Sequence, residues 1–169
     1  MHSFSTPITE LDVSKLRAGD TVTVSGYIYC GRDAVLPKIV QLYSEDRLAE
    51  SDIDLVGSLI FHSAVSQAGI GPTSSNKMQI EANIPPLSQA GVKIHLGKGK
   101  ISQETVEELH RYNSIFAVVP PVTALLMNSV IETKLIAFPE EGMEAFYRLQ
   151  VEKLPMIVAA AHGETIFKD

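Results

Sequence analysis

Residues 92–113 constrain the fold most, because they read as a strand, a short loop and a helix in direct succession. Val92-Lys93-Ile94-His95-Leu96 alternates strictly, which predicts a strand with Val92, Ile94 and Leu96 facing inward. Gly97-Lys98-Gly99-Lys100 then supplies a loop, and residues 102–113 carry the signals of a helix. A strand leading directly into a helix favours an α/β fold.

The helix signals in this unit are specific to its two ends. Ser102 is a good N-cap, and Glu104 lies in the first turn, where its charge complements the helix dipole. Ile101 before the cap and Val106 inside it match a hydrophobic staple. Asn113 suits the end of the helix. The boundaries of this helix are therefore predicted from both sides.

Similar patterns recur along the chain and predict a mixed sheet with a few helices. The expected strands are 21–25 and 27–29, with a bulge or bend at Gly26, followed by 57–62, 115–119, 131–137, 145–152 and 155–161. The expected helices are 36–48, with Pro37 in its first turn, and a segment from Pro121 through Met127. The polar stretch 44–54 reads as a solvated helix end and loop. We expect one domain over residues 1–169, because no linker or repeat divides the chain.

Composition excludes several classes of protein. The 169 residues suffice for one sizeable core, and a net charge of −6 disfavours nucleic acid as a partner. No apolar run approaches the length of a membrane span, and the N-terminus lacks the features of a secretory signal, so we expect a cytoplasmic protein. Cys30 is the only cysteine, which excludes an intrachain disulfide and an iron–sulfur cluster held by this chain alone.

Two loops offer groups that suit an anionic ligand. In Cys30-Gly31-Arg32-Asp33, Arg32 can present a two-pronged donor to a carboxylate, although Arg32 and Asp33 also fit a surface charge pair beside a turn. Gly71-Pro72-Thr73-Ser74-Ser75-Asn76-Lys77-Met78 gathers hydroxyls, an amide and backbone N–H groups, as an anion-binding nest does. An ordinary polar turn has the same composition.

The third loop is Gly97-Lys98-Gly99-Lys100, in which glycines on both sides of Lys98 allow the backbone to approach a ligand closely. Its spacing is not that of a phosphate-binding P-loop. A flexible surface turn is the alternative interpretation.

In order and approximate spacing, these loops resemble the β subunit, or C-terminal domain, of class I iron–sulfur fumarate hydratases and the related tartrate dehydratases. The resemblance covers nearly the whole chain. It is carried by Thr6-Pro7-Ile8, Leu16–Asp20, Arg32-Asp33-Ala34, Phe61-His62, Gly71-Pro72-Thr73-Ser74, Lys77-Met78, Gly97-Lys98-Gly99, Glu141–Ala145 and His162-Gly163.

The resemblance implies a swivelling β/β/α domain and a heteromeric hydro-lyase. A partner α subunit would hold a [4Fe–4S] cluster through three cysteines, and one iron would act as a Lewis acid on the substrate. The implied reaction is the reversible hydration of fumarate to malate. Tartrate or a methylated fumarate is an alternative substrate, and a non-catalytic module that binds a dicarboxylate or a partner protein is the alternative from another class. The isolated chain would be inactive, and it would self-associate, for instance as a homodimer, or expose an apolar patch that a partner covers.

Site residues follow from the resemblance position by position. Thr73 would be the base that removes the carbon-bound proton, and a threonine hydroxyl needs a nearby carboxylate for that role. Arg32 would bind a substrate carboxylate, Lys98 would help to neutralise it, and Ser74 and Lys77 would complete the substrate site.

Three departures bear on activity. Leu36 stands where the family usually has histidine, Lys77 replaces an arginine, and Pro120-Pro121 replaces small residues. The histidines are too scattered in sequence to indicate a metal site. His62 and His162 are each expected to be hydrogen-bonded structural residues.

Overall fold

The computed structural model describes residues 1–66, 69–73, 77–120 and 128–167, and within residues 65–80 it describes the backbone alone. In chain order the elements are β1 (His2–Ser5), α1 (Glu10–Ser14), β2 (Thr21–Cys30), α2 (Leu36–Ser44), the 3-10 helix η1 (Leu48–Ser51), β3 (Leu59–Phe61), β4 (Ser63–Ser66), β5 (Gly69–Thr73), α3 (Lys77–Gln89), β6 (Ile94–Gly97), α4 (Gln103–Arg111), β7 (Ile115–Val118), β8 (Val130–Ala137), the 3-10 helix η2 (Pro139–Glu144), β9 (Phe146–Ala161) and β10 (Glu164–Thr165).

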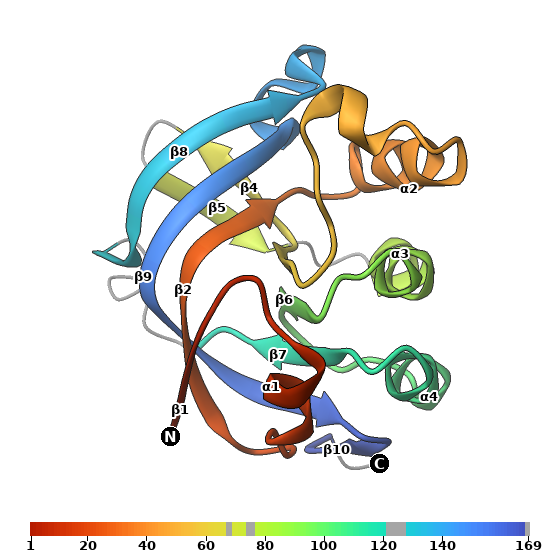
Figure 1. The fold of residues 1–169 in the computed structure, drawn as a ribbon, viewed down its shortest axis with the longest axis vertical. Coiled ribbons are helices and arrows are strands. Elements are labelled where there is room, and N and C mark those ends of the chain that lie inside the picture. Colours follow the sequence, from red (N-terminus) through yellow and green to blue (C-terminus); the bar gives the residue numbers. More distant parts are fainter. Residues whose placement is uncertain (67–68, 74–76, 121–127, 168–169) are drawn as a thin grey trace.

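Strands β2, β3, β6, β7 and β9 close a ring (Figure 1). The first four run parallel to one another, and β9 pairs antiparallel with both β7 and β2. β9 closes the ring because its 16 residues are long enough to lie along β7 at one end and β2 at the other. The prediction of an α/β fold with a mixed sheet is confirmed.

Alternate residues of the ring strands point inward and form the main core. This cluster includes Val22, Val24, Ile28, Leu59, Phe61, Ile94, Leu96, Ile115, Ala117, Leu149, Val151 and Val158, all buried. The spacing of two along each strand is what a closed sheet with a filled interior requires.

The opposite face of the parallel strands is covered by α2, α3 and α4, which lie along one side of the ring (Figure 1). Ile60 of β3 packs with Leu36 and Ile39 of α2, and Phe116 of β7 packs with Val106 of α4. Because both faces are covered, β3 and β7 are apolar throughout rather than alternating. None of the helices in the described part of the chain is long and apolar enough to cross a membrane.

Each predicted strand has a counterpart in the structure, but β1, β4, β5 and β10 were not predicted, and β5 includes residues 71–73, which were expected in a loop. The bulge near Gly26 is confirmed as a register shift between Val24 and Gly26 in the pairing with β9. Two strands at 145–152 and 155–161 were wrong, because β9 is continuous. Val151 lies opposite Gly26 and Leu154 opposite Val24, so Lys153, with φ of 51°, absorbs the extra residue without ending the strand.

The predicted inward alternation also begins later than expected. β6 starts at Ile94, and Val92 packs in the cluster beneath α2 and α3 rather than inside the ring. Its position before the strand explains the difference.

The best-marked helix is the best predicted. In α4 the Ser102 hydroxyl accepts a hydrogen bond from the Thr105 N–H, Ile101 and Val106 share one cluster, and Asn113 beyond the end has φ of 55°. α2 holds Pro37 in its first turn as predicted, but it ends at Ser44 instead of reaching residue 48. The helix expected from Pro121 to Met127 lies outside the described residues.

Two α-helices of the described residues were not predicted. α1 is short and begins at a capping box between Thr9 and Asp12. α3 contains Pro85 and Pro86, and proline inside a helix costs about 3 kcal/mol. Burial of neighbouring apolar side chains offsets that cost. Lys77, expected in a loop, is in fact the first residue of α3.

Candidate functional site

The carboxyl ends of the parallel strands meet at one edge of the ring. The ladder continues past β2, β3 and β7: Gly31 N–H bonds to Phe61 O, His62 N–H to Leu96 O and Val119 N–H to Gly97 O. The residues that follow, including Arg32 and Lys98, therefore leave the sheet at the same edge. In α/β sheets this is the edge at which ligands usually bind.

Arg32 leaves β2 where the chain turns into α2. A side chain at Gly31 would place its Cβ 2.9 Å from Val35 Cγ2 and 3.0 Å from Phe146 Cδ1, so glycine is needed for this close approach. The guanidinium is partly buried, and its Nε lies 3.7 Å from the Glu144 carboxylate of η2. This ion pair holds Arg32 against η2. The alternative interpretation, a surface charge pair of Arg32 with Asp33, did not include Glu144.

Lys98 is exposed in the loop between β6 and α4. Gly99 has φ of 83°, a conformation that favours glycine. The loop ends at Ser102, whose N–H donates to the Glu81 carboxylate of α3 at 2.5 Å. The loop is thus tied to β6 at one end and to α3 at the other, with Lys98 between them.

The backbone of Thr73 reaches the same edge. Thr73 ends β5 and lies opposite Ser63 in β4, which is separated from β3 by His62 alone. Lys77 begins α3 four residues later. The side chains of Thr73 and Lys77 and the whole of Ser74 lie outside what is described, so the convergence of all these side chains on one cleft stays a prediction.

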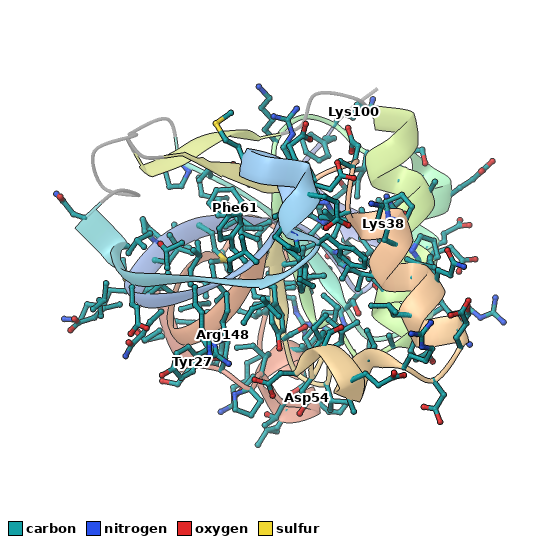
Figure 2. The ribbon with its side chains drawn as sticks, turned by 90° about the horizontal axis from the view of Figure 1, so that it is seen from above. Tyr27, Lys38, Asp54, Phe61, Lys100 and Arg148 are labelled. Carbon is teal, nitrogen blue, oxygen red and sulfur yellow. The ribbon has the colours of Figure 1, made fainter. Side chains whose placement is uncertain are left out.

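Other cationic side chains are engaged elsewhere. Lys38 of α2 bonds to Glu141 at 2.7 Å and lies over the Phe138 ring, and Arg148 lies 4.7 Å from the centre of the Tyr27 ring. Figure 2 shows these two groups in different parts of the molecule. The carboxyl edge is followed by Arg32 on one strand and by the loop that carries Lys98 and Lys100 on another.

Sequence reasoning missed a buried pair of histidines beneath this edge. His62 Nε2 lies 3.2 Å from His95 Nδ1, and His95 Nε2 lies 2.8 Å from the Ser88 hydroxyl. Burial lowers the pKa of His62 to about 4, and burial together with His62 lowers the pKa of His95, so both rings are neutral at physiological pH. The strict alternation over 92–96 was the available signal, since it turns His95 away from Ile94 and Leu96.

His62 and His162 are both hydrogen-bonded, as was expected of them. His62 bonds to His95 as above, and His162 Nε2 lies 3.1 Å from the Val13 carbonyl. Over the described ranges, no three His, Cys, Asp or Glu side chains gather where they could hold a metal ion.

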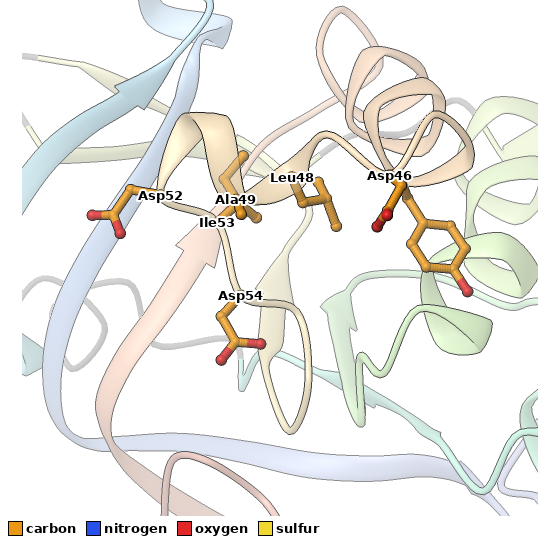
Figure 3. Close-up of a pocket in the computed structure, with 7 residues that line it drawn as sticks. Asp46, Leu48, Ala49, Asp52, Ile53 and Asp54 are labelled. Carbon is orange, nitrogen blue, oxygen red and sulfur yellow. The ribbon is translucent and has the colours of Figure 1, made fainter.

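Hollows elsewhere on the surface suit a dianion poorly. One of about 460 Å³ lies beside η1 and is lined by Asp46, Asp52 and Asp54 (Figure 3). Another, of about 590 Å³, lies between α3 and α4 and includes Glu104 and Glu108. Like charges repel an anionic ligand from both.

Comparison with known proteins identifies the family. Residues 3–169 match the model of the family described as Fumarase C-terminus. The chain belongs to that family.

Its relatives include separate β subunits and parts of longer enzymes. The chain is 33% identical to a putative L(+)-tartrate dehydratase subunit beta of Methanocaldococcus jannaschii, covering 96% of this chain and 89% of the relative. It is 26% identical to L(+)-tartrate dehydratase subunit beta of Escherichia coli, covering 98% and 86%. It is 24% identical to the anaerobic class I fumarate hydratase of Escherichia coli, covering 90% of this chain and 29% of that enzyme. The recognition made from sequence motifs is confirmed.

This member of the Fumarase C-terminus family lacks the thiolate ligands that an iron–sulfur cluster requires. An iron–sulfur cluster normally takes three or four thiolates, and the sequence has one cysteine. The Cys30 thiol is fully buried and donates to the Ser63 carbonyl at 3.2 Å, and burial raises its pKa to about 12. This thiol therefore stays protonated and unavailable to a metal.

Proposed function

We propose that this chain is the β subunit of a class I hydro-lyase that hydrates fumarate reversibly to malate at a site shared with a cluster-bearing α subunit. The observation that supports the proposal is the parallel pairing of β2, β3 and β6, which end at one edge and are followed there by Arg32, by β4 with its partner Thr73, and by Lys98. Family membership and the match to separate β subunits support it. We also propose that residues 1–169 form a single swivelling β/β/α domain.

The division of labour follows from charge. Fumarate and malate are dianions, so their carboxylates need cations placed in advance. Arg32 would bind one carboxylate, with Glu144 limiting the orientation of the guanidinium. Lys98, Lys77 and Ser74 would supply further charge and hydrogen bonds. Removing a proton next to a carboxylate builds charge on that carboxylate, and such a preorganised contact is worth ~3–4 kcal/mol.

Thr73 would take the proton from carbon and return it in the reverse direction. The hydroxyl needs a carboxylate to accept its own proton, and we assign that carboxylate to the α subunit. The cluster of the α subunit would supply Lewis-acid activation of the hydroxyl group or water.

L(+)-tartrate is the second candidate substrate. The tartrate dehydratase β subunits match nearly their whole length to this chain, whereas it spans under a third of the Escherichia coli class I fumarate hydratase. Both substrates are four-carbon dianions, so the same cations serve either one.

A binding module without catalysis is the remaining alternative, and Leu36 favours it. Leu36 is the first residue of α2 and is buried against the sheet, where it offers no proton donor.

Anaerobic co-expression with the candidate α subunit tests these proposals. We expect the complex to turn over fumarate, with mesaconate and L(+)-tartrate assayed beside it, and the isolated chain to show neither turnover nor iron. Turnover of tartrate alone would replace the first substrate with the second. A stable complex that binds dicarboxylates without turnover would establish the binding module, and turnover by the isolated chain would contradict the subunit assignment.

A further inference from the structure

Three buried polar side chains form a hydrogen-bonded chain between the ring and α3. The Ser88 hydroxyl lies 2.8 Å from His95 Nε2, and His95 Nδ1 lies 3.2 Å from His62 Nε2. Both histidines are fully buried, and Ser88 is 3% exposed. Solvent therefore does not take part in these hydrogen bonds, and the protein alone sets the geometry of the Ser88–His95–His62 chain.

Each member belongs to an element that leads to a different candidate site residue. His62 is the single residue between β3 and β4, and the β4–β5 hairpin ends at Thr73. His95 lies within β6, whose end precedes Lys98. Ser88 lies in α3, which begins at Lys77. The Ser88–His95–His62 chain thus links the three elements that position Thr73, Lys77 and Lys98.

An apolar core at these positions would be simpler to stabilise. A buried hydrogen bond contributes about 1 kcal/mol net, and a buried polar group without a partner costs ~1–3 kcal/mol. His62 Nδ1 is buried and has no hydrogen-bond partner among the described residues. The network therefore adds little stability, whereas its directional bonds fix one arrangement of its elements, as buried polar networks can.

We propose that His62 and His95 are positioning residues that, with Ser88, hold the β4–β5 hairpin, β6 and α3 in the relative placement that the proposed site at the carboxyl edge requires. The catalytic part of this inference rests on the proposed hydro-lyase function. The placement of the hairpin does not, so the two parts are tested separately.

Amide hydrogen exchange of the isolated full chain tests the placement. Ser88→Ala removes the hydroxyl at one end of the Ser88–His95–His62 chain. Ser114→Ala is the matched control, because Ser114 is equally buried and its hydroxyl donates to the Val92 carbonyl at the amino end of β7. We expect exchange in β4 and β5 to be faster in Ser88→Ala than in Ser114→Ala by about 5- to 10-fold, the effect of one lost hydrogen bond. Equal exchange of the hairpin in both variants would overturn the proposal.

Kinetics of the reconstituted complex test the consequence for catalysis. A site misplaced by about 1 Å loses up to ~100-fold in rate, so Ser88→Ala and His62→Leu should lower kcat at least ~10-fold with KM nearly unchanged. His62→Gln should restore most of kcat, because its amide nitrogen replaces Nε2 as the partner of His95. Ser114→Ala should match the wild type.

The two arms fail differently. An inactive wild-type complex would count against the proposed function. Amide hydrogen exchange in the β4–β5 hairpin would still decide whether the Ser88–His95–His62 chain positions that hairpin. An active complex in which His62→Leu keeps the wild-type kcat would overturn the role of His62 as a positioning residue.

Discussion

Thr73 is the residue on which the proposed chemistry depends, and its backbone is fixed by pairing with Ser63 beside the end of β3. In the reconstituted complex we expect Thr73→Ala to lower kcat by ~100-fold or more with little change in substrate affinity, because a base acts in the transition state. Thr73→Ser keeps the hydroxyl and should retain most activity. Steady-state kinetics on both variants measure this, and an equal loss in both would point to packing of the threonine methyl instead.

Lys98 should behave differently because it meets the dianion before and during reaction. Lys98→Ala is expected to raise KM and to lower kcat, each by about 10-fold or more, as loss of a charge contact does. Lys100→Ala, two residues further along the same loop, is the control and should change either constant by less than about 2-fold. Binding of a dicarboxylate inhibitor gives an independent measure. Equal effects at the two lysines would indicate that only the net charge of the loop matters.

The predictability of the site residues depended on whether their position follows from local sequence. Arg32 and Lys98 were found because each lies in a loop between a predicted strand and a predicted helix, within a motif that resembles the family. The structure brings the two loops to one edge because strand ends gather there in a parallel sheet. The His62–His95 pair was missed because its members are 33 residues apart and meet only through the parallel register of β3 and β6. That register depends on tertiary packing rather than on either strand.

At the scale of elements, local signals succeeded where they agreed with packing. α4 has a cap, a staple and a terminating asparagine, and it forms as predicted. α3 carries two adjacent prolines and forms nonetheless, because Ile84 and Leu87 are fully buried by it. The single β9 strand was divided in the prediction because no local signal reveals that two neighbours, β2 and β7, would hold it extended.

The junction of β2 and α2 provides a test at this scale. In Gly31→Ala the new Cβ would approach Val35 and Phe146 to about 3 Å, and the strain should destabilise the isolated chain by ~1–3 kcal/mol. Gly97→Ala is the control, since its Cβ would meet Phe116 at an ordinary 3.4 Å. Urea unfolding of both variants measures the difference. If Gly97→Ala is destabilised as much as Gly31→Ala, close approach of α2 is not the reason for glycine at position 31.

At the scale of the whole molecule, ring closure explains how a chain of this size builds the carboxyl edge at which the proposed site lies. Closure by β9 leaves no open edge among the five ring strands, and the helices cover one face of the parallel strands. The carboxyl edge, followed by Arg32 and Lys98, is where the proposed function places substrate and partner. Predicting this closure required the pairings of β9 with β2 and β7, which join residues far apart in sequence.

The same ring buries two neutral imidazoles, which makes the stability of the whole chain depend on pH. The pKa of His62 is lowered by burial from 6.5 to about 4, and that of His95 is lowered by burial and by His62. Between these values the unfolded chain binds more protons than the folded one. The histidine contribution is therefore fully present above about pH 6.5 and is lost as the pH falls toward about 4.

We expect the free energy of unfolding to fall by about 2 kcal/mol for His62 alone between about pH 7.5 and about pH 5, at 1.36 kcal/mol per pKa unit below 6.5. His95 adds to this loss. Hydrogen bonds from Lys93 and Asn113 lower the pKa of the Glu10 carboxyl from 4.5, so its protonation reduces the stability below this pH interval rather than within it. Urea unfolding of the isolated chain at both pH values measures the difference, and His62→Gln should reduce it, because glutamine does not titrate. A pH dependence unchanged in His62→Gln would show that His62 is not the group responsible.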